Sequence, residues 1–171
     1  MVQISRLNTL GTEDACALAH LLIVTVQDGA SIGFMASLDA HQADTYWQGV
    51  ARELPLGLHL WVAHRDGAIL GTVQLAPCGK DNGRHRGEVQ KLFVHPAARG
   101  LGIARTLLAT LEEEACRLGL TLLVLDTEAG SDAEHLYRRQ GWQKCGEIPD
   151  YALSPDGRPH ATAYYYKRPG A

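Results

Sequence analysis

A loop rich in small residues, at positions 95 to 105, carries the clearest chemical signal in the sequence. It reads HPAARGLGIAR and connects an apolar run typical of a strand to an amphipathic segment typical of a helix. Gly100 and Gly102 would leave backbone N–H groups at the helix N-terminus open to a ligand, and the helix dipole there favours an anion. The loop therefore predicts a phosphate or pyrophosphate site, with Arg99 and Arg105 as ionic contacts. A tight turn with no ligand is the alternative.

Two other nucleotide-binding motifs do not fit this loop. A dinucleotide fingerprint would need a third glycine where Arg105 stands, and it would follow its strand directly. The chain has no Gly-Lys-Ser/Thr sequence, which excludes a P-loop. Asp126, which ends the next predicted strand, would suit a ribose, but too little chain follows it to complete a dinucleotide fold.

The composition predicts one folded domain over residues 1–171, of which 46% are apolar and 20% charged. The net charge of −3 gives no general attraction to nucleic acid or to anionic membranes, so an anionic ligand must be held locally. The first residues lack a basic segment followed by a long apolar run, and the four cysteines are scattered. These features predict a cytoplasmic protein with reduced thiols. The histidines form no HExxH or close Cys/His pair, which predicts no metal site.

Hydrophobic spacing predicts the elements that would position this loop. Thr12 would cap the first helix, Ser131 and Glu134 would form a capping box, and Arg65-Asp66-Gly67 would close a hairpin. Strands are predicted at 2–7, 58–64, 68–75, 88–94, 121–126, 142–148 and 160–167, and helices at 12–26, from about 39 through 50, at 103–118 and from 131 to 141.

The order of these motifs resembles the GNAT superfamily of acetyl-CoA-dependent N-acetyltransferases. The Arg/Gln-x-x-Gly-x-Gly/Ala element of that family is matched by Arg99, Gly102 and Ala104. Its A-x-x-x-Y-x-x-x-G-[FW] element is matched by Ala133, Tyr137, Gly141 and Trp142. The resemblance implies an α/β (α+β) fold with a mixed, mostly antiparallel sheet flanked by helices. It also implies a splayed parallel strand pair that forms the cofactor cleft.

Longer segments are similar to the tabtoxin-resistance acetyltransferases within that superfamily. These segments are GASIGFM at 29–35, EVQKLFV at 88–94, LDTEAGS at 125–131 and SPDGR at 154–158. This similarity covers nearly the whole chain. It implies a small amino-acid-like or β-lactam toxin as the acceptor and a role in antibiotic resistance.

Acetyl transfer from a thioester to an amine needs one group that protonates the departing thiolate and another that removes a proton from the amine. Tyr137 suits the first role because a phenol is protonated at pH 7, and the family implies the same role; plain core packing is the alternative. Glu88 and Asp126 suit the second, directly or through water, with Glu128 as a weaker choice. A solvated strand start and a turn cap are the alternatives for Glu88 and Asp126.

The resemblance also implies which residues hold the cofactor. The pantetheine arm would pair with the backbone of the strand that precedes the glycine loop. Gly130 stands where many family members have Asn, which leaves Ser131 or the backbone to contact the arm. The predicted cofactor contacts are Leu92, Phe93, Val94, Arg99, Gly100, Leu101, Gly102, Ile103, Ala104, Arg105, Ser131, Ala133 and Tyr137.

The acceptor is expected to enter from the opposite side, between the loop after the first helix and the last hairpin. Asp28 could pair with an ammonium group, and aromatic side chains could cover a small apolar body. Core packing is the alternative for Phe34, Met35 and Trp47. The candidate acceptor residues are Asp28, Ser31, Phe34, Met35, Trp47 and Tyr151.

Together these features predict a monomeric or homodimeric N-acetyltransferase that uses acetyl-CoA as co-substrate and transfers the acetyl group directly to a small-molecule amine. No metal, nucleic acid or membrane partner is expected. The alternatives are a non-catalytic acyl-CoA sensor, a protein or peptide N-acetyltransferase, and, more weakly, a small nucleotide-binding oxidoreductase.

Overall fold

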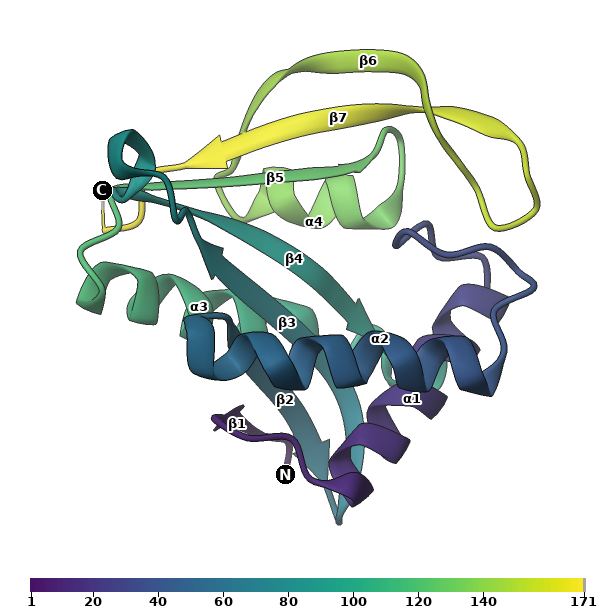
Figure 1. Ribbon diagram of the computed structural model, residues 1–171. Helices are drawn as coiled ribbons and strands as arrows, with labels where there is room; N and C mark the ends of the chain where they lie inside the picture. The colour runs from purple at the N-terminus through teal and green to yellow at the C-terminus, as the bar shows by residue number, and fades with distance from the viewer. Residues whose placement is uncertain (171) are drawn as a thin grey trace.

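The computed structural model describes residues 1–170, which form one seven-stranded sheet flanked by helices (Figure 1). In chain order the elements are β1 (Gln3–Leu7), α1 (Thr12–Gln27), α2 (Ala40–Glu53), β2 (His59–Arg65), β3 (Ala68–Pro77), β4 (Arg86–Val94), α3 (Ile103–Arg117), β5 (Leu122–Glu128), α4 (Asp132–Arg139), β6 (Gln143–Leu153) and β7 (Pro159–Lys167).

The strand order is β1-β2-β3-β4-β5-β7-β6. Neighbouring strands are antiparallel except β4 and β5, which run parallel. The parallel ladder has three registered pairs, from Arg86 opposite Leu122 to Glu88 opposite Val124. Beyond Glu88 the two strands separate, as Figure 1 shows. The mixed sheet with one splayed parallel pair is therefore confirmed.

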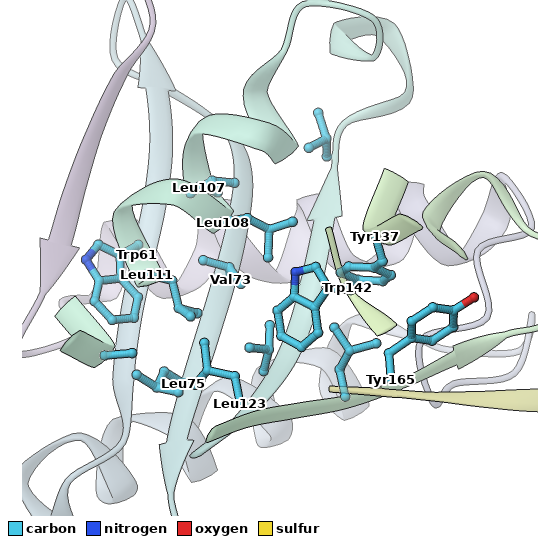
Figure 2. Packing of buried hydrophobic residues seen from close by; sticks show 14 of the residues in the cluster. Trp61, Val73, Leu75, Leu107, Leu108, Leu111, Leu123, Tyr137, Trp142 and Tyr165 are labelled. Atoms are coloured by element: carbon cyan, nitrogen blue, oxygen red, sulfur yellow. The ribbon is translucent and has the colours of Figure 1, made fainter. Parts of the chain in front are cut away.

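Helices cover both faces of the sheet at β2 to β4. Along β2, Leu60 and Val62 pack into the cluster formed with α1 and α2, whereas Trp61 and Ala63 pack into the cluster formed with α3. Figure 2 shows leucines of α3 over Trp61 and the neighbouring strands. A strand buried on both faces needs a continuous apolar run, which β2 has, and each fully buried large side chain contributes about 1.5–3 kcal/mol.

Only one face of β5 is covered. Leu123 and Leu125 are buried in the α3 and α4 cluster, whereas Val124 is half-buried and Asp126 is exposed on the opposite face. The layer of α1 and α2 packs on β3 and β4 and leaves this face of β5 open. At the β4–β5 junction the sheet therefore changes from a layer that helices cover on both faces to one with a face that a ligand can reach.

Two predicted helix caps differ from the structure. Gly11, not Thr12, is the N-cap of α1, because Thr12 already has helical geometry, and the N-cap makes no side-chain hydrogen bond. At α4, Ser131 accepts from the Glu134 backbone N–H as predicted, but the Glu134 carboxylate accepts from Gly130 N instead of closing the box on Ser131.

Two further observations concern the chain as a whole. The four cysteines are all free. No helix between residues 1 and 170 is both long and apolar enough to pass through a bilayer.

Candidate active site

A bulge in β4 opens the site. The register of β4 against β3 shifts opposite Thr72–Gln74, and Lys91 has a φ of +51°, the left-handed region that non-glycine residues rarely adopt. Phe93 and Val94 continue to pair with β3, but residues 92–94 have no register with β5. One edge of the β4 backbone is therefore free to hydrogen-bond a ligand.

A cavity of about 940 Å³ lies at this split. It brings together β4, the α3 N-terminus, the end of β5 and α4. Leu101 is outside it and 57% exposed, and Tyr137 does not line it. The predicted cofactor residues that do line it are Leu92, Phe93, Val94, Arg99, Gly100, Gly102, Ile103, Ala104, Arg105, Ser131 and Ala133.

The glycine loop presents the start of α3 to this cavity. Gly100 and Gly102 have φ of +77° and +78°, and Gly102 is the helix N-cap. A Cβ added at either position would meet no atom within 4 Å, so both glycines face open space. The first hydrogen bond of the helix joins Thr106 N to Gly102 O, which leaves the preceding N–H groups without intrahelical partners. This arrangement suits an anionic group.

Three arginines line the same cavity, and they are not equivalent. Arg99 Nη1 lies 2.5 Å from Asp28 Oδ2, so its charge is already partly compensated. Arg105 and Arg139 form no ion pair with any residue in the range 1–170. Sequence reasoning missed Arg139, because only the spatial position of α4 brings it here. Asp28, predicted to contact the acceptor, instead lies in this cavity.

The open face of the sheet carries the predicted carboxylates. Glu88 and Asp126 are both exposed, at the last registered pair of β4 and β5 and just beyond it. Lys91 lies near both: burial lowers the pKa of its ammonium group, and the negative charges of Asp126 and Glu88 partly oppose that shift. This half-buried lysine was also missed, although a lysine within the run EVQKLFV was the available signal.

Two tyrosines, Tyr151 and Tyr164, lie close to this face of the sheet. Interaction with Tyr151 and burial raise the pKa of Tyr164 to about 12, with smaller contributions from Asp126 and Glu88. The rings of Tyr151 and Tyr164 meet edge to face at 5.8 Å. Tyr151, one of the predicted acceptor residues, is exposed and packs on Tyr164, which is registered opposite Asp126.

Tyr137 is 6% exposed, and its ring packs edge to face on Trp142 at 5.8 Å, as seen in Figure 2. Burial, and then the charge of Asp126, raise the pKa of its hydroxyl, so it is protonated at neutral pH. Within residues 1–170 this hydroxyl has no hydrogen-bond partner. It is nevertheless not one of the fully buried side-chain atoms that lack a partner there, which are Trp47 Nε1 and His59 Nδ1. The Tyr137 hydroxyl therefore keeps contact with accessible space near Asp126.

The other predicted acceptor residues are dispersed. Ser31 lines the cavity and lies 2.9 Å from His160 Nε2, which is 3.9 Å from Glu128 Oε2. Phe34 packs on Tyr46 and lies under the Lys91 ammonium group. Met35 is exposed and does not line this cavity. Trp47 is fully buried in the core, which removes it from any ligand surface.

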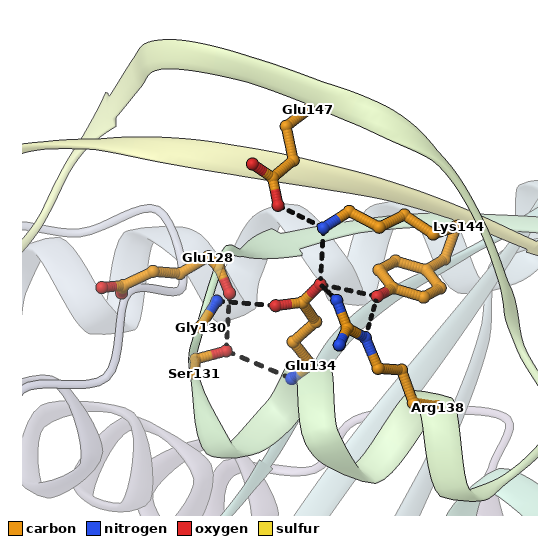
Figure 3. A network of polar contacts seen from close by, with 8 residues as sticks. Glu128, Gly130, Ser131, Glu134, Arg138, Lys144 and Glu147 are labelled. Carbon is orange, nitrogen blue, oxygen red and sulfur yellow. Dashed lines mark hydrogen bonds and ion pairs between the residues drawn. The ribbon is translucent and has the colours of Figure 1, made fainter.

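A buried carboxylate fixes the start of α4 beside the cavity. Glu134 accepts from Gly130 N at 2.6 Å and from the Tyr165 hydroxyl at 2.6 Å. It also pairs with Arg138 at 2.8 Å and with Lys144 at 3.1 Å, as Figure 3 shows. Hydrogen bonds and the Lys144 charge outweigh burial and lower its pKa from 4.5 to about 2. Glu134 thus ties α4 to the β5–α4 turn, β6 and β7.

No group of three or more His, Cys, Asp or Glu side chains between residues 1 and 170 is placed to hold a metal ion.

Known proteins are similar to this chain in sequence. Residues 57–144 match the model of the acetyltransferase (GNAT) domain. An uncharacterized N-acetyltransferase of Azospirillum brasilense is 34% identical over 127 residues, which cover 73% of this chain and 74% of that protein. The aminoalkylphosphonate N-acetyltransferase of Salmonella typhimurium is 30% identical over 138 residues, 77% of this chain and 90% of that protein.

Solved structures superimpose on this protein over almost its full length. A ribosomal-protein-alanine N-acetyltransferase from Brucella melitensis superimposes with a TM-score of 0.78 and 27% identity, covering 98% of this chain and 99% of that one. A putative acetyltransferase from Salmonella typhimurium, solved with acetyl-CoA, gives a TM-score of 0.77 at 20% identity and covers 100% and 95% of the two chains.

Proposed function

Because this chain belongs to the GNAT acetyltransferase family, we propose that it transfers the acetyl group of acetyl-CoA directly to the amine of a small molecule. The observation that carries the proposal is the cavity at the β4–β5 split. It joins an anion-binding helix N-terminus to a free strand edge. Tyr137, Asp126 and Glu88 lie around the same split.

The cavity residues fit acetyl-CoA. The pyrophosphate would be held by the N–H groups at the start of α3, with Arg105 and Arg139 supplying uncompensated positive charge. The pantetheine arm would run along the free edge of residues 92–94. When bound, the coenzyme supplies the acetyl thioester.

The chain supplies the proton transfers. Tyr137 would donate its hydroxyl proton to the departing thiolate, since its raised pKa keeps that proton in place until a strong base forms beside it. Glu88 and Asp126 would take the amine proton, directly or through water, because both carboxylates are exposed on the open face of the sheet. Transfer is direct, with no covalent enzyme intermediate.

Acetyl-CoA is expected to raise the melting temperature. At about 100 times its Kd, a ligand that binds only the native state adds roughly 2.7 kcal/mol to the free energy of unfolding. Differential scanning fluorimetry measures the shift. Arg105→Ala and Arg139→Ala should each reduce it, whereas Arg52→Ala, on α2, serves as the matched control. No shift at millimolar acetyl-CoA would contradict cofactor binding, and with it the proposed function.

Loss of the carboxylates is expected to slow the reaction in a way that high pH relieves. Glu88→Gln and Asp126→Asn should each lower kcat/KM about 10-fold at pH 7, and the double variant at least 100-fold. The deficit should shrink by pH 9, since more of the amine is then neutral without a base. Glu113→Gln, on an exposed part of α3, is the control. A double variant with wild-type activity at pH 7 would remove both residues from the mechanism.

The sequence also supports a proposal for the class of acceptor, the cellular location and the oligomeric state. The similarity to tabtoxin-resistance acetyltransferases supports an amino-acid-like or β-lactam toxin, handled in the cytoplasm by one domain acting as a monomer or homodimer. A protein or peptide acceptor is the second candidate, because a structural neighbour is described as a ribosomal-protein-alanine N-acetyltransferase. Thiol release with amino acids, aminoglycosides, polyamines, a β-lactam amino acid and peptides separates these candidates. Acetyl-CoA binding without thiol release from any amine would instead indicate an acyl-CoA sensor.

A further inference from the structure

A second hollow, which we term the α2 groove, lies beside the predicted base residues. It has a volume of about 660 Å³ and lies between the C-terminal half of α2, the start of β2, the C-terminal end of β3 and Gln90 of β4. Ala76, which lines it, is registered directly opposite Glu88, so the groove opens next to that carboxylate. None of the residues predicted from sequence to contact the acceptor lines this groove.

Two glutamines and a tyrosine form the polar part of the groove. Gln74 and Gln90 are registered opposite each other on β3 and β4. Gln74 is only 2% exposed, and its Nε2 donates to the Tyr46 hydroxyl at 3.0 Å, which is its one side-chain partner within residues 1–170. The Gln90 amide has no hydrogen-bond partner in the same range. A primary amide can donate two hydrogen bonds and accept two, so this pair has donors and acceptors to spare.

The Lys91 ammonium group, 5.9 Å from the centroid of the Tyr46 ring, donates to Ile32 O and lies near Glu88 and Asp126, so its charge is already partly compensated. The groove itself offers no cation to balance an anion. Its remaining walls are largely apolar, and its lining contains the carboxylate of Glu53 but no lysine or arginine. Burial raises the pKa of Tyr46 to about 12 and lowers that of His59, so at neutral pH neither side chain is charged. A carboxylate bound here would lose its hydration without gaining a cation from the lining, which is costly, whereas an uncharged amide would find matching partners.

We propose that the α2 groove binds the part of the acceptor beyond its amine, and that this part is an uncharged amide on an apolar body. Acceptors of this class are amino amides. The amine would lie toward Glu88, and an amide N–H would donate to the side-chain oxygen of Gln90, which lines the groove and has no other partner within residues 1–170. The inference rests on the proposed acetyltransferase function and adds the chemical class of its acceptor.

Three acceptors with one side chain test the inference. L-Leucinamide and L-leucine methyl ester are both uncharged beyond a weakly basic amine, but only the amide has N–H donors; L-leucine carries a carboxylate. The expected order of kcat/KM in a thiol-release assay is amide, then ester, then free acid. The amide should exceed the ester about fivefold to tenfold, the ratio that one hydrogen bond typically gives.

The variant Gln90→Leu should bring the ratio of amide to ester near one, with the KM for acetyl-CoA unchanged. Gln48→Leu, on the exposed part of α2, should keep the wild-type ratio. Equal use of amide and ester by the wild type, or a ratio that Gln90→Leu leaves intact, would overturn the inference while the acetyltransferase function stands. So would activity on other amines with none on these three. Failure of every amine, despite acetyl-CoA binding, would overturn the function itself.

Discussion

Tyr137→Phe is expected to lower kcat about 100-fold, the lower end of what a positioned proton donor contributes. The change removes only the hydroxyl, which makes no hydrogen bond within residues 1–170, and the ring that packs on Trp142 stays. The melting temperature and the Kd for acetyl-CoA should therefore change little. Steady-state thiol release gives kcat, and calorimetric titration of acetyl-CoA gives the Kd.

Thr110→Val is the control, because it also removes a single hydroxyl, one that donates to the Thr106 carbonyl within α3 and lies outside the site. This variant should keep wild-type turnover. An unchanged kcat in Tyr137→Phe would show that the thiolate obtains its proton elsewhere. Equal losses of kcat and of acetyl-CoA affinity would instead place the hydroxyl in cofactor binding.

Glu134→Gln is expected to have the largest effect on stability. The carboxylate is 3% exposed and holds two cationic side chains, a tyrosine hydroxyl and a backbone N–H. The lowering of its pKa from 4.5 to about 2 corresponds to roughly 3 kcal/mol of stability at neutral pH. Urea denaturation at pH 7 should show a loss of that order. Glu147→Gln, which removes only an exposed partner of Lys144, should cost at most about 1 kcal/mol.

The way in which the stability loss of Glu134→Gln depends on pH distinguishes a lost ionic interaction from a packing defect. A carboxylate whose pKa is lower in the folded state than in the unfolded state makes its full contribution to the free energy of unfolding when the pH is above the unfolded-state pKa. That contribution disappears as the pH falls toward the folded pKa. The difference between wild type and Glu134→Gln should therefore be complete above pH 5 and shrink between pH 4.5 and 2. A difference that stays constant from pH 7 to pH 3 would contradict the ionic role assigned to Glu134.

Local sequence patterns predicted most of the fold. The amphipathic spacing after the glycine loop places α3 within one residue of its observed end, because a helix that buries one face repeats its apolar residues at a fixed interval. The positive φ of Asp66 and Gly67 forms the predicted β2–β3 hairpin turn. Most of the predicted cofactor residues share one cavity because they flank a single strand-to-helix turn.

The acceptor side could not be predicted in the same way. The partner of Arg99 is Asp28, 71 positions away, and no local pattern reports such a contact. The α2 groove depends on the register of Gln74 against Gln90 and on the placement of Tyr46 against Gln74, which only the assembled fold determines. The prediction that Trp47 contacts a ligand was wrong for a related reason. Helix spacing shows that a residue faces inward, but it does not show whether a cavity or packed side chains lie there.

The one-sided cover of β5 has an evolutionary consequence. Between β2 and β4, each substitution must fit helices on both faces, where a changed volume leaves a cavity or a clash. On the open face that carries Asp126 and Tyr164, a side chain can change without repacking any helix. Under the proposed function, mutation there would alter amine selectivity while the fold and the cavity at the β4–β5 split persist. If the proposed function holds, the same sheet combines a coenzyme site that packing constrains with an acceptor surface that is free to diverge.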